Sequence, residues 1–136
     1  REVMEGLGAR LCARHATPEQ VAELKELCKE MHAIEDATAR VEVNSRFHSM
    51  IAQFSGNDRV VDYLADFRER VNRDMYLSSF NAVRTHDCDD EHDHIVDAIE
   101  RHDEVAAENA MRKHINNAFI FKRANAELQD KNLNEV

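Results

Sequence analysis

The sequence predicts an all-α protein, an antiparallel bundle of about six or seven helices in one domain over residues 1–136. Apolar residues recur at helical spacing along most of the chain, and no stretch alternates as a β-strand would. Only three glycines and one proline occur, too few for a turn-rich β-fold. Hydrophobic residues make up 43% and charged residues 33%, which is the composition of a folded domain with one hydrophobic core.

The first helix is expected from about Arg1 to about His15, and its apolar residues recur every four positions: Val3, Leu7 and Leu11. A second helix is expected from Pro18, because proline suits the first helical position. Thr17 before it and Gln20 after it form the pattern of a capping box. The apolar side chains of this helix fall on one side: Val21, Leu24, Leu27, Cys28 and Met31.

The third and fourth helices are expected on either side of the sequence SGND. The third begins after a short acidic break at residues 35–36. Gly56 is suited to a left-handed helix stop, and Asn57 is suited to cap the next helix. That fourth helix is expected from about Asp58 to about Phe80, and the polar stretch NAVRTHDCDD after it has the composition of a loop.

Two further helices complete the predicted bundle. The fifth is expected from about Cys88 to Arg101, and Asp103 can cap a sixth that continues past Phe121. The tail ELQDKNLNEV loses the helical periodicity and is expected to fray.

Composition narrows the function classes. The formal net charge is −9, so this chain lacks the basic surface that nucleic-acid binding requires. No long apolar run predicts a membrane span, and the first residues do not resemble a secretory signal. Cys12, Cys28 and Cys88 show neither CxxC spacing nor an even count, which favours a reducing cytoplasm over a disulfide framework.

Three of the eight histidines fall on the apolar stripes of three different predicted helices. His48 follows Asn44 on the third helix, His92 heads a stripe on the fifth, and His114 lies on a stripe of the sixth. Each one alone is most simply a buried histidine with a hydrogen-bond partner, whereas one shared metal ion would satisfy all three. Spacing alone leaves both interpretations open. The other five histidines are less suggestive: His15, His32, His86, His94 and His102.

The runs NSRFHSMIAQFSGN and EHDHIVDAIERHDEVAAENAMRKH carry a more specific pattern. They resemble the C-terminal effector-binding (FCD) domain of GntR-type transcriptional regulators of the FadR subfamily. The opening EGLGARLCARHATPEQVAEL resembles the start of that domain, so the likeness covers nearly the whole chain. The residues that match the family pattern are Asn44, His48, Gly56, Asn57, Glu91, His92, Ile95, Ala98, Ile99, Asp103, Ala107, Met111 and His114.

The resemblance implies an all-α regulatory domain that is not an enzyme. It implies a divalent metal ion, such as Zn or Ni, held by Asn44, His48, His92 and His114, with a small carboxylate effector beside it. It also implies a homodimer that reaches operator DNA through a winged helix-turn-helix domain. That domain is missing from this sequence, so we expect the chain to be the sensor half of a regulator or a sensor domain acting alone.

Asn44 stands where many members of this family have aspartate. An amide oxygen can coordinate a metal, but it brings no charge. We therefore expect weaker metal affinity than an aspartate site would give, and a stronger attraction for an anionic effector. Direct ligation by Asn44 and ligation through a bound water both remain open.

A carboxylate effector requires a fixed cation or donor. Arg68 shares a stripe with apolar residues of the predicted fourth helix, and a guanidinium suits bidentate carboxylate binding. Arg73 and Arg70 are weaker candidates, and Asn117 lies one turn beyond His114. The alternative for Arg68 is a side chain that reaches the surface or pairs with an acid on a neighbouring helix.

Two other functions compete with a regulatory domain. A metal-dependent hydrolase of the HD type is suggested by three His-Asp pairs, at residues 86–87, 92–93 and 102–103. A purely structural dimerising bundle would satisfy its histidines internally. The acidic run HDCDDEHD favours a solvated helix start over a second metal site.

Overall fold

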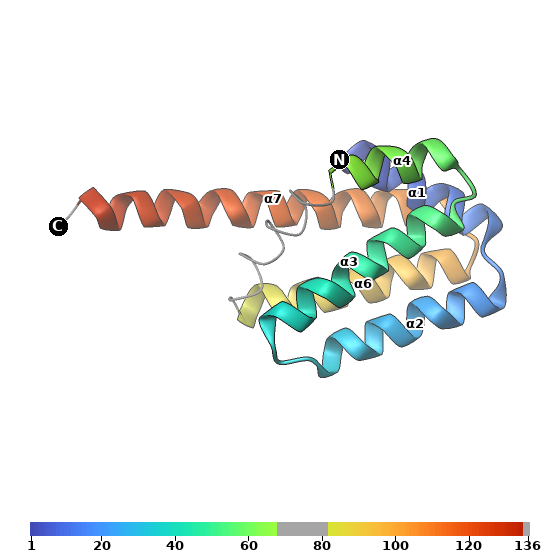
Figure 1. Ribbon diagram of the computed structural model, residues 1–136, viewed down its shortest axis with the longest axis horizontal. Coiled ribbons are helices and arrows are strands. Elements are labelled where there is room, and N and C mark those ends of the chain that lie inside the picture. Colours follow the sequence, from blue (N-terminus) through green and yellow to red (C-terminus); the bar gives the residue numbers. More distant parts are fainter. Residues whose placement is uncertain (68–81, 135–136) are drawn as a thin grey trace.

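The computed structural model describes residues 1–67 and 82–134 as an all-helical bundle, and no strand occurs in these two ranges. The described helices are α1 (Glu2–His15), α2 (Pro18–Ala33), α3 (Ala37–Phe54), α4 (Asp58–Asp66), α6 (Ala82–Glu100) and α7 (Glu104–Asn134). α2 packs against α3 and α6, and the first part of α7 packs against α1 and α6, while Figure 1 shows the rest of α7 continuing past the other helices. The predicted all-α bundle is confirmed. None of the described helices is both long and apolar enough to cross a membrane.

Side-chain caps set the starts of α2, α3 and α4, and those at Thr17 and Asn57 were predicted. Thr17 Oγ1 accepts a hydrogen bond from the backbone N–H of Gln20, and Gln20 Oε1 accepts one from the backbone N–H of Thr17. Asp36 caps α3, and Asn57 caps α4 by accepting from two backbone N–H groups. Gly56 adopts a φ of +66°, the left-handed conformation that glycine takes without a steric cost.

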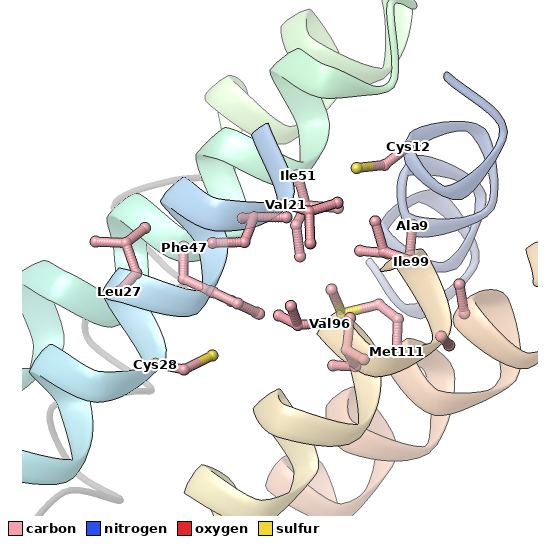
Figure 2. Packing of buried hydrophobic residues seen from close by; sticks show 14 of the residues in the cluster. Ala9, Cys12, Val21, Leu27, Cys28, Phe47, Ile51, Val96, Ile99 and Met111 are labelled. Carbon is pink, nitrogen blue, oxygen red and sulfur yellow. The ribbon is translucent and has the colours of Figure 1, made fainter. Parts of the chain in front are cut away.

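One hydrophobic core joins the helices, and in Figure 2 the labelled side chains from α1, α2, α3, α6 and α7 point into it. Its largest fully buried apolar side chains are Phe47, Leu24, Met31, Ile51, Ile95, Ile99 and Met111. These residues repeat at helical spacing, which is why the sequence predicts the core faces of α2, α3, α6 and α7 well.

The buried face of α1 is not its stripe of large apolar residues. Val3 is 62% exposed, whereas Glu5, Gly6, Gly8, Ala9, Cys12 and Ala13 are buried. The neighbouring helices approach too closely for larger side chains. A Cβ atom at Gly8 would lie 3.3 Å from Val60 Cγ1, and one at Gly6 would lie 2.6 Å from Arg112 Cγ. Small residues therefore form the contact surface of α1.

The predicted loop at residues 81–90 is wrong, because α6 already begins at Ala82. Its polar composition disfavours a helix locally, but tertiary contacts outweigh that preference. Asp89 forms a buried ion pair with Arg40 of α3, and Arg40 also donates to the backbone carbonyl of Met31 at 2.5 Å. These contacts hold the first turns of α6 against α2 and α3.

One predicted helix end differs from the structure, and another falls outside the described residues. The tail expected to fray from residue 127 is helical as far as Asn134. An ion pair between Arg123 and Glu127, at 3.2 Å and one turn apart, supports this part of α7. The described part of α4 ends at Asp66, and residues 68–80 of the predicted fourth helix lie outside the described residues.

Core packing gives a first testable expectation. Ile99 is fully buried, so Ile99→Ala should lower the free energy of unfolding by about 2–5 kcal/mol through lost burial and a cavity. Val105 on α7 is 57% exposed, so Val105→Ala should change the free energy of unfolding by less than about 0.5 kcal/mol. Denaturant unfolding of both variants measures the difference, and equal effects would contradict this core.

Candidate metal centre

Three histidines from three helices meet inside the bundle. His48 of α3 is 7% exposed, His92 of α6 is 1% exposed and His114 of α7 is 2% exposed. Their ring centroids lie 4.6 Å apart for His92 and His114, 5.2 Å for His48 and His114, and 5.8 Å for His48 and His92. One ring nitrogen from each lies within 4.8 Å of the others. The predicted set therefore converges, while the remaining five histidines are all exposed.

Two carboxylates fix the protons on two of these rings. Glu5 of α1 bonds to Nδ1 of His48, and Oε2 of Glu91 lies 2.7 Å from Nδ1 of His114. An ionised carboxylate only accepts hydrogen bonds, so each Nδ1 carries a hydrogen and donates it. In the neutral form of either ring, the remaining lone pair is then on Nε2. A carboxylate behind a histidine is the usual arrangement for a metal-ligating imidazole.

The two Nε2 atoms of His48 and His114 face each other at 3.3 Å. Two lone pairs at this separation repel unless a proton or a cation lies between them. Metal–nitrogen bonds of about 2.0–2.1 Å in tetrahedral geometry would separate two ligand atoms by about 3.3 Å. The spacing therefore suits two ligands of one metal ion.

The electrostatic surroundings set the charge of Glu5 and of His114. Burial raises the pKa of the Glu5 carboxyl, but His48 and Arg1 outweigh it and hold this pKa well below its usual range. Arg1 Nε donates to Glu5 at 2.7 Å. Burial lowers the pKa of His114 to about 4, despite the opposing hydrogen bond to Glu91. At neutral pH, Glu5 is therefore an anion and His114 a neutral ring.

Asn44 and an apolar wall complete the surroundings. Asn44 lies one turn before His48 on α3 and is buried, and its Oδ1 atom and Nδ1 of His92 are both shielded from solvent. The Phe47 ring packs 4.7 Å from the His92 ring and edge-on to the His48 ring at 5.6 Å, measured between centroids. Ligation by Asn44, directly or through water, stays a prediction.

The effector residues predicted from sequence are only partly visible. Asn117 of α7 donates to Glu91 Oε1 at 2.7 Å, and is thus linked to the centre through the carboxylate that bonds His114. Arg68, Arg70 and Arg73 lie outside the described residues.

Sequence reasoning missed Glu5, gave Cys88 no role in the site, and named Glu91 only as a residue that matches the family pattern. Cys88 Sγ lies 4.0 Å from His92 Nε2 and 4.0 Å from His114 Nδ1. A signal for Cys88 was present, since residues four apart share a helix face and Cys88 lies four before His92. Glu5 gave a weaker signal as an acid on the small-residue face of α1.

The His-Asp pairs do not form shared sites. Asp93 bonds to His32 at 3.0 Å, and Asp103 caps α7 by accepting from the backbone N–H of Ala106. His102 bonds instead to the backbone carbonyl of Ala13 at 2.7 Å. This arrangement does not support the hydrolase alternative.

Comparison with known proteins decides the family. The sequence model of the FCD domain matches residues 1–117 of this chain. The chain belongs to the FCD domain family. This FCD domain is 32% identical over 115 residues to the HTH-type transcriptional repressor NanR of Escherichia coli K12, and equally to that of Shigella flexneri. Each alignment covers 79% of this chain and 42% of the relative, so the chain spans less than half the length of these curated relatives.

A solved structure supports the same assignment. GntR of Streptococcus agalactiae matches this FCD domain with a TM-score of 0.67 and 27% sequence identity, over 91% of this chain and 55% of the other. The predicted likeness to the FCD domain of GntR-type regulators is thereby confirmed. The curated relatives are named as transcriptional repressors.

The cysteines of the FCD domain give a second testable expectation. Burial raises the pKa of both Cys12 and Cys28 to about 12, and nearby acids such as Asp93 add to the effect at Cys28. Both thiols should stay protonated and resist iodoacetamide at neutral pH, whereas half-buried Cys88 reacts. Mass spectrometry should find one adduct on the folded apo-protein and three after unfolding. A second adduct on the folded chain would contradict this burial.

Proposed function

We propose that this FCD domain is the ligand-sensing part of a transcriptional regulator, and that it holds one divalent metal ion through His48, His92 and His114. The observation that carries the proposal is the pair of Nε2 atoms of His48 and His114, which face each other at 3.3 Å with a carboxylate behind each ring. Neutral imidazole is a common ligand of Zn, Ni and related ions. The metal supplies a positive charge inside the bundle.

A small carboxylate effector fits such a centre. Three neutral imidazoles and the amide of Asn44 leave the ion its full charge, and only the more distant Glu5 and Glu91 offset it. An anion that reaches an open coordination position gains a strong attraction in this buried setting. Asn117, Arg68 and Arg73 are the proposed contacts for the effector.

Effector binding in this domain is proposed to change the DNA binding of another domain of the same protein. The chain carries a formal charge of −9, so operator binding falls to an attached winged helix-turn-helix domain in a homodimer. The names of the curated relatives, helix-turn-helix repressors, agree with this division. If the two sites are coupled, effector and operator must change each other's affinity by the same factor.

Metal analysis combined with thermal shifts tests the proposal. The chain is stripped with a chelator, reloaded with Ni²⁺ or Zn²⁺, and screened against small organic acids with and without the metal. We expect one ion per chain, a higher melting temperature on loading, and a further rise with an acid only in the metal-loaded form. No stoichiometric uptake would contradict the metal site. Stabilisation by an acid regardless of metal would contradict the effector site.

A further inference from the structure

We propose that the centre contains a second ligand set, made of Cys88, Glu91 and His114, which binds a thiophilic divalent cation through the thiolate of Cys88. Cadmium is the simplest example of such a cation. The inference rests on the proposed function in one respect, namely that His114 serves both ligand sets. With this second set, a metal ion can occupy either of two positions. The position that it occupies decides whether it attracts an anionic effector.

Three atoms that can bind a metal lie close together at one edge of the His114 ring: the sulfur of Cys88, a carboxylate oxygen of Glu91 and Nδ1 of His114 itself. Cys88 Sγ lies 4.0 Å from His114 Nδ1, and Glu91 Oε2 lies 2.7 Å from the same nitrogen. The ligand atoms of the three residues all lie within 4.8 Å of one another. A tetrahedral ion with bonds of about 2.3 Å to sulfur and about 2.0 Å to nitrogen separates these atoms by about 3.5 Å. Small side-chain shifts therefore suffice to admit an ion.

The fold presents these ligands from rigid elements. Cys88 and Glu91 are three residues apart on α6, so they lie on neighbouring positions of one helix face. His114 comes from α7 and is buried, and Asn117 holds the other oxygen of Glu91 at 2.7 Å. Ligands on packed helices need little reorganisation on binding.

The two ligand sets exclude each other at His114. In the three-histidine set, His114 binds through Nε2 and keeps the hydrogen on Nδ1 for Glu91. In the cysteine set, the ion takes Nδ1, and the hydrogen moves to Nε2, which then donates to His48 Nε2 at 3.3 Å. The thiol proton of Cys88 leaves to solvent when the sulfur coordinates. One chain therefore holds one ion, whichever set is used.

The two positions differ in the charge they leave on the ion. The thiolate of Cys88 and the carboxylate of Glu91 together neutralise a divalent cation, whereas the three imidazoles leave its charge intact. Soft thiolate ligands favour ions such as Zn²⁺ and Cd²⁺ over harder ions. A thiophilic ion in the cysteine set is thus expected to suppress the response to a carboxylate effector that an ion in the histidine set supports.

Ultraviolet absorption during titration with Cd²⁺ tests the inference, because a cadmium–thiolate bond gives a charge-transfer band. Elemental analysis counts the bound ions in the same samples, and a parallel titration uses Ni²⁺. The variants are Cys88→Ser and a control, Cys28→Ala, whose thiol is buried elsewhere in the core. We expect one cadmium ion per chain with the band in the wild type and in Cys28→Ala. In Cys88→Ser the band is lost and cadmium affinity falls at least about tenfold, while Ni²⁺ still binds.

Each other result has a definite meaning. Cadmium bound without the band, a band that survives in Cys88→Ser, or two cadmium ions per chain would overturn the inference and leave the three-histidine site standing. A wild-type protein that takes up neither Ni²⁺ nor Cd²⁺ would overturn the proposed function, and the cysteine set with it.

Discussion

Replacing His48 and His114 together with alanine should abolish the uptake of Ni²⁺ by the chelator-stripped protein. The two Nε2 atoms that face each other at 3.3 Å are removed, and His92 and Asn44 alone form too weak a site. At a metal concentration 1,000 times the dissociation constant, the wild type gains about 4 kcal/mol of stability, and the variant should gain none. Elemental analysis and thermal melting with and without Ni²⁺ measure both effects.

The matched control is a double variant of two exposed histidines, His86→Ala with His94→Ala, which should bind Ni²⁺ as the wild type does. Circular dichroism of each apo-protein checks that the bundle is still formed, because Glu91 loses its partner His114 when that ring is removed. Stoichiometric metal retained by a folded His48→Ala/His114→Ala protein would contradict the site assignment.

Glu5→Gln should weaken Ni²⁺ binding about 10–100-fold, although Glu5 is not a ligand. The carboxylate holds the hydrogen of His48 on Nδ1, so that the Nε2 lone pair points at His114. A neutral amide removes this preference, because its NH₂ group can donate to Nδ1. The hydrogen of the His48 ring can then lie on Nε2, where it blocks metal binding. It also removes a negative charge that stabilises a cation nearby. Competition titrations with a coloured chelator give the affinity ratio.

Glu2→Gln is the control for that variant. Glu2 lies on the same helix, but it is half-buried and pairs with Arg112 of α7 at 3.0 Å instead of with a histidine. It should leave the affinity for Ni²⁺ within about twofold, since surface ion pairs contribute little. Equal affinities for Glu5→Gln and the wild type would show that the proton arrangement on His48 does not govern binding.

Much of this arrangement follows from periodicity in the sequence. His48, His92 and His114 each lie among apolar residues at helical spacing, so their inward direction follows from the helices that carry them. That three inward rings meet at one point depends on how the helices cross, which spacing alone does not give. The family resemblance supplied that information.

The features that the sequence did not reveal depend on contacts between distant parts of the chain. Glu5 bonds to His48, which lies 43 positions later in the sequence, so no local pattern predicts this contact. The first turns of α6 are held by the Asp89–Arg40 ion pair, 49 positions apart, against the local preference of a polar stretch. The buried face of α1 is formed by small residues because its neighbours lie close, and small residues give a weak hydrophobic signal.

The central claim is that one cation lies between Nε2 of His48 and Nε2 of His114. The most direct test is a crystal structure of the Ni²⁺-loaded chain with anomalous scattering recorded at the nickel edge. We expect a single strong peak per chain, within bonding distance of both nitrogens, with Nδ1 of each ring still bonded to Glu5 or Glu91. A nickel peak elsewhere, or the two rings turned away from each other around an empty space, would contradict the account.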